Sequence, residues 1–359
     1  MGPSRWRVDA MSGFEIAGRP VGPGHPVYIV AEMSGNHNRD YGTAERIVRA
    51  ARDCGADAVK LQTYTADTIT IDCDSGLFRV GSGNLWSGRT LYDLYQEAHT
   101  PWEWQPRLKT LAEGMGMHCF STPFDASAAD FLEMMEVPAY KIASCELVDL
   151  PLIEYVARKG KPVILSTGMA GREEIADALN AVRNAGMPHV ALLKCTTAYP
   201  SPPDEMNLLT IRRMAEDFGV PVGLSDHSLG IEIPVAAVAV GACIIEKHLV
   251  LDRSAGGPDH AFSLEPREFR AMVDAVRTVE KALGRIRYGP GESEAASLAY
   301  RRSLFVVRDV KKGEDFTPEN VRSIRPGHGL PPKCLPDVLG RRAARDIERG
   351  TPLGWEMIL

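Results

Sequence analysis

Two apolar segments of this 359-residue chain each end in polar residues closed by a histidine. They run from Val222 to His227 and from Ile244 to His248, so the histidines stand 21 positions apart (248 − 227). A single helix-sized stretch, 232–240, separates them, which is the layout of a strand, a crossover helix and a parallel strand. Because parallel neighbours lie about 4.8 Å apart, two imidazoles at their carboxyl ends can share one divalent metal. The spacing therefore predicts a metal site at these two histidines, with Asp226 and Glu246 as further possible ligands.

The rest of the chain repeats this alternation of short apolar strands and amphipathic helices. The predicted strands span 27–32, 58–63, 118–122, 139–144, 162–167, 190–195, 221–227 and 242–248. The predicted helices span 43–54, 101–115, 126–135, 151–158, 172–185, 208–218, 232–240 and 266–283. Eight such units predict an α/β fold of the (β/α)8 TIM-barrel type. A doubly wound open sheet is the alternative, but no GxGxxG motif follows the first strand.

Composition changes divide the chain into four parts. We expect a loose N-terminal tail and lead-in over 1–25, a catalytic barrel over 26–284, a polar linker over 285–299 and a small β-rich module over 300–359. The module holds an imperfect repeat, 308–313 and 345–350, and each copy ends in a glycine suited to positive φ.

Bulk composition excludes several classes of function. The net charge is −6, from 41 basic and 47 acidic residues, and no basic stripe indicates a nucleic-acid partner. No apolar run approaches the ~20 residues of a membrane span. Seven scattered cysteines without a CxxC motif indicate reduced thiols and a cytoplasmic protein.

One connection, 64–100, is much longer than the others and follows the second predicted strand. Long connections inside compact domains are usually functional or disordered. This one holds Trp86, Tyr92 and Tyr95, which are too many aromatic side chains for a plain linker. We interpret it as a lid or a substrate-specificity loop.

Polar residues stand at nearly every predicted strand end, although the strand bodies are apolar. In a (β/α)8 barrel these ends converge on the active site. Lysines and hydroxyl groups together suit a phosphate or carboxylate group. The residues that would form this anion-binding floor are Lys60, Thr122, Lys141, Ser144, Ser166 and Ser225.

Glu32, at the end of the first strand, is a candidate general base, although it could instead be an ion-pair partner of Lys60. Lys141 or Lys194 could also act as the Schiff-base lysine of a class I aldolase. The histidine pair favours the metal-dependent alternative, because a Schiff-base enzyme needs no metal.

As an ordered set, the strand-end motifs resemble the sialic acid synthase family. The resemblance covers nearly all of the chain after residue 25. The segments that carry it are AEMSGNH (31–37), VKLQT (59–63), STPF (121–124), YKIAS (140–144), LSTGM (165–169), GLSDH (223–227), EKH (246–248), GPD (257–259) and RPG (325–327).

The resemblance implies condensation of phosphoenolpyruvate with an N-acyl amino sugar, which gives a nine-carbon 2-keto acid and phosphate by C–O cleavage. It implies a barrel followed by an antifreeze-like (SAF) domain, which caps the partner's site in a domain-swapped homodimer and carries Arg325.

The resemblance also implies roles for individual residues. His227 and His248 would hold a divalent metal, Mn²⁺ or alternatively Mg²⁺ or Co²⁺, that polarises the sugar aldehyde. Glu32 would position or deprotonate the attacking water. Phosphoenolpyruvate would meet Lys60, Thr122, Lys141, Ser144, Ser166 and Ser225. The sugar would meet Gln62, Glu146, Tyr199, Asp259 and Arg325. Asp226 and Glu246 would then orient the two imidazoles instead of binding the metal.

Within the family, the insertion resembles that of the pseudaminic acid synthases, which implies 2,4-diacetamido-2,4,6-trideoxy-altrose as the sugar and pseudaminic acid as the product. Added aromatic surface suits a deoxy, methyl-bearing substrate. Thr197 departs from the asparagine of neuraminate-forming members. The alternatives are N-acetylneuraminate or legionaminate synthesis, another metal-dependent barrel aldolase or ulosonate synthase, and a non-catalytic sugar-binding homologue.

Overall fold

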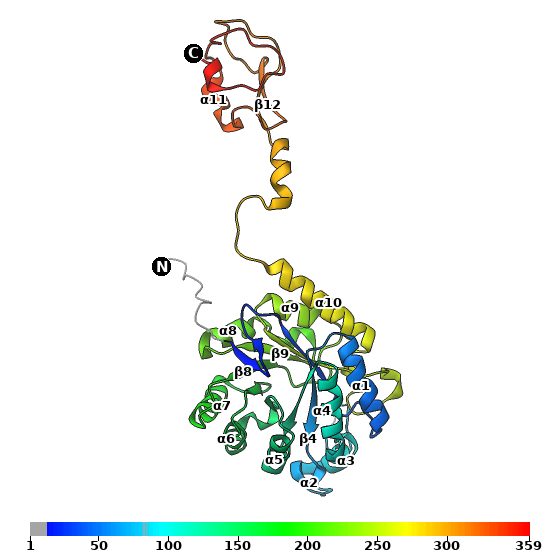
Figure 1. Ribbon diagram of the computed structural model, residues 1–359. Helices are drawn as coiled ribbons and strands as arrows, with labels where there is room; N and C mark the ends of the chain where they lie inside the picture. The colour runs from blue at the N-terminus through cyan, green and yellow to red at the C-terminus, as the bar shows by residue number, and fades with distance from the viewer. Residues whose placement is uncertain (1–12, 82, 84) are drawn as a thin grey trace. The chain divides into compact units, whose positions relative to one another are not determined.

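The computed structural model describes residues 13–81, 83 and 85–359. The chain divides into two compact units, the first ending at Gly284 and the second spanning Arg285–Leu359. Figure 1 traces both units.

The first unit is a closed barrel of eight parallel strands, which confirms the predicted fold. Around the barrel the strands follow the order β10-β3-β4-β5-β6-β7-β8-β9. Nearly every strand residue is buried, as expected for a parallel sheet that is covered outside and filled inside. The strands are β3 (Tyr28–Glu32), β4 (Ala58–Thr63), β5 (His118–Pro123), β6 (Tyr140–Ile142), β7 (Val163–Ser166), β8 (Val190–Cys195), β9 (Val222–Asp226) and β10 (Ile244–His248).

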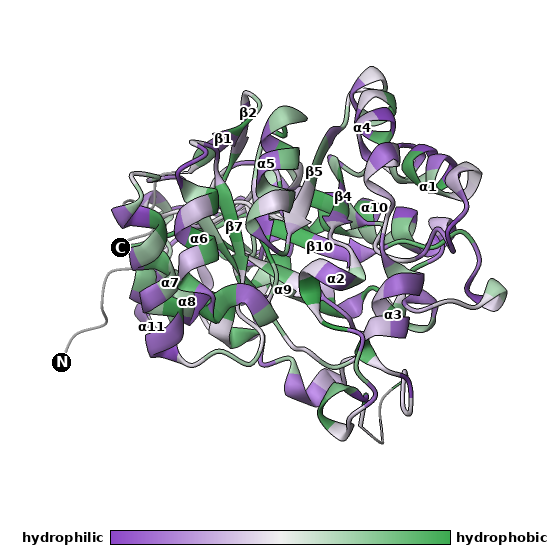
Figure 2. Cartoon of the chain, turned by 90° about the horizontal axis from the view of Figure 1, so that it is seen from below, coloured by the Kyte–Doolittle hydropathy of each residue, from purple (hydrophilic) through white to green (hydrophobic). Residues whose placement is uncertain are grey.

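Eight helices connect or follow these strands and surround them (Figure 1). Each buries one apolar stripe against the sheet, for example Ala44, Ile47 and Val48 of α1. Figure 2 shows strands such as β7 in the hydrophobic colour and hydrophilic segments on the surrounding helices. These helices are α1 (Tyr41–Asp53), α4 (Gln105–Gly114), α5 (Ala126–Met134), α6 (Leu150–Ala157), α7 (Arg172–Asn184), α8 (Leu209–Phe218), α9 (Glu232–Ala239) and α10 (Pro266–Leu283).

Aspartates cap several helices directly after the loops that leave the strand ends. The Asp40 carboxylate accepts from the Thr43 N–H, and Asp125 and Asp149 cap α5 and α6 in the same way. Each cap satisfies otherwise unpaired N–H groups and starts the helix at a defined residue. The caps therefore keep the loops between strand end and helix short and ordered.

The N-terminal lead-in contains an element that the sequence did not predict. β1 (Phe14–Ile16) and β2 (Arg19–Val21) form an antiparallel hairpin. Phe14, Ile16 and Val21 join the core of the barrel. Ala17 and Gly18 make the turn with φ of 47° and 79°, as a two-residue hairpin requires. Three-residue strands are too short to give a periodic signal. The tail predicted over 1–12 lies outside the described residues.

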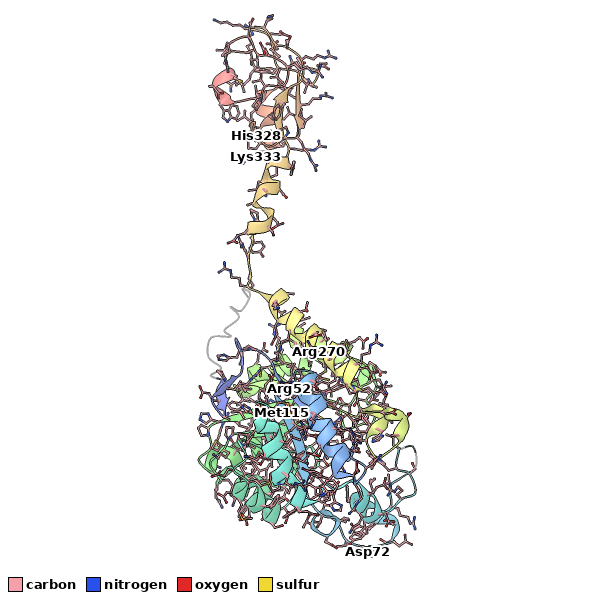
Figure 3. All side chains as sticks on the ribbon, turned by 45° about the vertical axis from the view of Figure 1, so that its right-hand side comes forward. Arg52, Asp72, Met115, Arg270, His328 and Lys333 are labelled. Carbon is pink, nitrogen blue, oxygen red and sulfur yellow. The ribbon has the colours of Figure 1, made fainter. Side chains whose placement is uncertain are left out.

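The long connection after β4 is folded. It contains α2 (Ala66–Ile69), the 3₁₀ helix η1 (Gly76–Phe78) and α3 (Leu91–Ala98). Figure 3 shows its residue Asp72 at the opposite end of the barrel from Arg52 and Met115. Arg52 and Met115 lie shortly before β4 and β5, at the end of the barrel where the strands begin. The insertion therefore lies at the carboxyl ends of the strands.

The second unit has its own small core, which includes Leu304, Val306 and Phe316. Residues 292–299 of the expected linker belong to the 3₁₀ helix η7 (Glu292–Tyr300). A two-stranded sheet of β11 (Ser303–Val306) and β12 (Val321–Ile324) follows. Further elements are η8 (Pro332–Cys334), α11 (Leu335–Val338) and η9 (Trp355–Met357).

The two copies of the sequence repeat in this unit pair with each other, through a bridge between Val310 and Ile347. Gly313 and Gly350 have φ of 82° and 89°, which confirms the predicted positive values. Across both units, none of the described helices is long and apolar enough to cross a bilayer.

Candidate active site

A cavity of about 470 Å³ opens at the carboxyl ends of the barrel strands. Most of the predicted site residues line it. They are Lys60, Gln62, Lys141, Ser144, Glu146, Ser166, Tyr199, Ser225, His227, His248 and Asp259. Glu32 and Thr122 are not among the lining residues, but both contact Lys60. Arg325 belongs to the second unit, so its relation to the cavity stays a prediction.

His227 and His248 come together because β9 and β10 are adjacent and parallel. Their ring centroids lie 5.3 Å apart. His227 Nδ1 lies 3.2 Å from the carbonyl oxygen of Thr196, so this nitrogen carries the proton and Nε2 keeps its lone pair. Both imidazoles are more than nine-tenths buried.

The expectation that Asp226 and Glu246 orient the imidazoles is wrong. The Asp226 carboxylate pairs with the Lys247 ammonium, and both side chains are fully buried. Glu246 accepts a hydrogen bond of 2.9 Å from Ser225. The main chain at Thr196 holds His227 instead. Successive strand residues face opposite sides of the sheet, so Asp226 and Lys247 each face away from the histidine that follows them in the chain.

The histidine pair fits a divalent metal in an open site. His248 Nδ1 is buried and has no hydrogen-bond partner among the described residues. Burial and the neighbouring His227 hold the pKa of His248 well below its usual range, so the ring is neutral and can act as a ligand. No cluster of three or more His, Cys, Asp or Glu side chains arranged for a metal occurs in the described part of the chain. Water or substrate oxygens would therefore complete the coordination.

On the floor of the barrel, one ammonium is shared by two carboxylates. Lys60 Nζ lies 2.7 Å from Glu32 and 3.7 Å from Glu246. Burial raises the pKa of Glu32 to about 7, against the attraction of Lys60 and with the repulsion of Glu246. Burial also acts on Glu246, but Lys141 and Lys60 outweigh it and lower the pKa of that carboxyl. One carboxylate is thus stably charged and the other titrates near neutrality.

The second lysine of the floor has no carboxylate at such a short distance among the described residues. Lys141 Nζ donates to Ser166 Oγ at 2.6 Å and to the Ile142 carbonyl oxygen at 2.9 Å. Burial lowers its pKa. Ser144 Oγ accepts from the Gly168 N–H at 3.0 Å. The floor offers ammonium and hydroxyl donors to an anion.

The residues predicted for the sugar lie around this floor. Gln62 donates to Glu32 at 3.1 Å. Glu146 Oε2 is buried without a hydrogen-bond partner among the described residues, and burial raises the pKa of Glu146 to about 7. The Tyr199 ring lies 4.6 Å from the His227 ring. Asp259 accepts from the Gly35 N–H at 3.1 Å and from the Ser34 hydroxyl.

Sequence reasoning assigned no role to two of the lining residues, Ser34 and Cys195. Cys195 Sγ lies 3.9 Å from His227 Nδ1. Burial raises the pKa of Cys195, but the His227 hydrogen bond outweighs it and brings the pKa to about 7. Ser34 follows the first strand end, so the pattern of polar strand ends extends to it.

Thr197, the position that departs from neuraminate-forming members, also lines the cavity. Its Oγ1 is buried and has no hydrogen-bond partner among the described residues. A Cβ on Gly168 would lie only 2.1 Å from this oxygen, so a glycine is needed beside it.

A closed barrel whose carboxyl end holds buried lysines, carboxylates and paired histidines defines the class of (β/α)8-barrel enzymes. The chain belongs to the NeuB family, whose model matches residues 47–288, and the SAF domain model matches residues 301–359.

Known relatives narrow the class further. A pseudaminic acid synthase of Campylobacter jejuni is 44% identical over 327 residues, which cover 91% of this chain and 95% of that protein. An N,N'-diacetyllegionaminic acid synthase of Legionella pneumophila is 36% identical, covering 95% and 97% of the two chains. A solved N-acetylneuraminic acid synthetase of Leptospira borgpetersenii superposes with a TM-score of 0.72 at 32% identity, covering 80% of this chain and 95% of that one.

Proposed function

We propose that this chain condenses phosphoenolpyruvate with 2,4-diacetamido-2,4,6-trideoxy-altrose to give pseudaminic acid and phosphate. The observation that carries the proposal is the meeting of a lysine-and-hydroxyl floor with a histidine pair in one cavity. The 44% identity to a pseudaminic acid synthase of Campylobacter jejuni supports the choice of sugar.

The floor is suited to the phosphate and carboxylate of phosphoenolpyruvate. Lys60 and Lys141 supply charge, and the hydroxyls of Ser144, Ser166 and Ser225 line the same cavity. Both lysines are nearly inaccessible to solvent. Binding of the anion in this low-dielectric position fixes C3 of the enol at one place in the barrel.

Glu32 is the proton acceptor of the proposed reaction. C3 of phosphoenolpyruvate forms a bond with the aldehyde carbon of the open-chain sugar. The carbonyl pair moves onto the aldehyde oxygen, and positive charge is left at C2. Water adds to C2 and gives one proton to the Glu32 carboxylate, which passes it to the aldehyde oxygen to make a hydroxyl group. The C2–O bond to phosphate then breaks, phosphate leaves with the bonding pair and the second proton of the water, and C2 becomes the keto carbon. The six sugar carbons and three carbons of phosphoenolpyruvate make the nine-carbon acid. A carboxyl whose pKa is about 7 is matched to this transfer at neutral pH.

His227 and His248 would hold a divalent ion, which we propose to be Mn²⁺, with Mg²⁺ or Co²⁺ as substitutes. Such an ion supplies Lewis-acid polarisation of the sugar carbonyl. The protein keeps both rings buried and close together, and the hydrogen bond to the Thr196 carbonyl oxygen fixes the tautomer of His227.

We also propose a domain-swapped homodimer in which Arg325 of the second unit reaches the sugar site of the partner. The guanidinium of an arginine suits hydrogen bonding to the hydroxyl and acyl oxygens of a sugar acid precursor.

All seven cysteines are unpaired, which supports a reducing cytoplasmic environment.

A phosphate-release assay tests the proposed reaction. The protein is mixed with phosphoenolpyruvate and Mn²⁺, and then with one of three sugars: the 2,4-diacetamido-2,4,6-trideoxy-altrose, its legionaminate-forming isomer, or N-acetylmannosamine. We expect release with the first sugar and little with the others. Release that is fastest with another sugar would reassign the substrate, and no release with any would overturn the proposed reaction.

A further inference from the structure

The insertion after β4 contributes only apolar or aromatic side chains to the cavity. Of its described residues, those that line the cavity are Tyr64, Ile69, Val80, Trp86, Leu91, Leu94, Tyr95 and Ala98. The same segment contains five acidic residues and two arginines, and none of those seven charged residues lines the cavity.

Four of these charged side chains form ion pairs within the insertion. Arg89 pairs with Glu97 at 2.6 Å, and Arg79 pairs with Asp74. Asp67 accepts a hydrogen bond of 3.1 Å from Tyr92 Oη. The segregation of charged and apolar side chains is therefore built into the fold of the segment, and its apolar face is turned to the cavity.

A continuous row of rings joins this face to the histidine pair. The Tyr199 ring lies 4.6 Å from His227, and the Trp86 ring lies 5.4 Å from Tyr199. Trp86 Nε1 donates to the Pro258 carbonyl oxygen at 2.8 Å, across 172 positions of sequence. This hydrogen bond anchors the insertion to the loop that follows β10, so the row of rings has a fixed direction away from the histidines.

Val80 is held in place beside this row by a short hairpin. Its N–H donates to the Arg89 carbonyl oxygen at 2.9 Å, and its own carbonyl oxygen accepts from the Gly88 N–H at 3.1 Å. Leu91 begins α3, whose N-cap Thr90 accepts from the Asp93 N–H. The main chain therefore presents both apolar side chains on ordered backbone.

We propose that Val80, Trp86 and Leu91 form an apolar wall that selects sugars whose end remote from the reacting carbon is a deoxygenated methyl carbon. This inference rests on the proposed function. The sugar aldehyde has to lie at the histidine pair, so the far end of the sugar extends along the ring row to the wall. A hydroxyl there would lose water without gaining a hydrogen bond, whereas a methyl group would be favourably buried.

The test compares two sugars that differ only by a hydroxyl at C6: the 2,4-diacetamido-2,4,6-trideoxy hexose and its 6-hydroxy counterpart. We expect kcat/KM of the wild type to favour the methyl sugar by about 10- to 100-fold. Val80→Thr and Leu91→Asn keep the size of the side chain but add polar atoms. Each should lower that ratio by about tenfold. Leu77→Asn is the matched control, because Leu77 lies in the same insertion but is 91% exposed.

Equal kcat/KM for the two sugars in the wild type, or an unchanged ratio in both wall variants, would overturn the proposed wall while leaving the reaction intact. If neither sugar supports phosphate release, the proposed function fails. Calorimetric titration of the same two sugars, with phosphoenolpyruvate present, then measures their affinities and tests the proposed selectivity of the wall without catalysis. Tighter binding of the methyl sugar supports it, and equal binding refutes it.

Discussion

The Lys60 ammonium lies 2.7 Å from the Glu32 carboxylate, and the two side chains are 5% and 1% exposed. Glu246 approaches the same ammonium at 3.7 Å. Burial and the repulsion of Glu246 raise the pKa of Glu32, whereas Lys141 and Lys60 outweigh burial at Glu246 and lower its pKa. Glu32 carries the raised pKa, which makes it the titrating member of this cluster.

The pH dependence of catalysis tests this assignment. Only deprotonated Glu32 accepts a proton, so kcat/KM should rise as the pH rises through about 7, the pKa to which burial brings Glu32. Glu32→Gln should lower kcat by about 10² to 10⁴ and remove this acidic limb. The measurement is a pH profile of phosphate release.

Glu146 supplies the matched control for that profile, because its pKa is also raised to about 7. Glu146→Gln should keep the acidic limb and raise the KM of the sugar. A limb that survives in Glu32→Gln and disappears in Glu146→Gln would make Glu146 the base instead.

Metal removal tests the histidine pair. A chelator should abolish phosphate release by the wild type, and added Mn²⁺ should restore it, because the two imidazoles stay side by side in the cavity as ligands for the ion. His248→Ala should stay inactive after Mn²⁺ is added and should bind the ion at least tenfold more weakly by calorimetry. Activity that persists in chelator-treated protein would contradict the metal assignment.

Lys141 is expected to bind phosphoenolpyruvate. A hydrogen bond to a charged group contributes about 1.5–3 kcal/mol, so Lys141→Met should raise the KM of phosphoenolpyruvate by about 10- to 100-fold. Ser166→Ala should have a smaller effect, because Ser166 contacts the ammonium at 2.6 Å but is itself neutral. Steady-state kinetics with phosphoenolpyruvate varied measures both.

Lys194→Met is the control for this prediction. Lys194 Nζ donates to the Cys195 carbonyl oxygen at 2.8 Å and is not one of the residues that line the cavity. Trapping of a lysine–substrate adduct by borohydride at either lysine would instead support the class I aldolase alternative.

The buried pair of Asp226 and Lys247 is expected to matter for stability. Lys247→Met leaves an uncompensated carboxylate in the interior and should cost about 3–5 kcal/mol of unfolding free energy. The double variant Asp226→Leu, Lys247→Met should recover most of that loss. Urea unfolding measures all three proteins, and a single variant within about 1 kcal/mol of wild type would show that the pair is not tightly coupled.

Substitution of Arg325 tests whether the second unit acts on the partner's barrel in a swapped dimer. Arg325→Ala should raise the KM of the sugar more than that of phosphoenolpyruvate, because the proposed contact is to the sugar. Mixed with His248→Ala protein, it should regain part of the activity, since a mixed dimer then pairs an intact barrel with an intact second unit. If the two variants do not complement each other after subunit exchange, the second unit does not act across the dimer.

The sequence by itself determined the barrel and the composition of its catalytic end. All eight predicted strands are present, and the bounds predicted for α10 agree with those observed, because apolar runs and amphipathic periods are local properties of the chain. Parallel strands bring their carboxyl ends to one face, so polar residues at strand ends could be placed together without knowing any contact. The roles of these residues in catalysis stay predictions.

Only the tertiary structure decided which polar groups pair. Asp226 stands next to His227 in sequence, yet its partner is Lys247, since neighbouring residues of a strand face opposite sides of the sheet. The anchoring of Trp86 to Pro258 was likewise not predicted. Contacts between residues far apart in the chain depend on how the whole backbone closes, and local sequence patterns carry no signal for them.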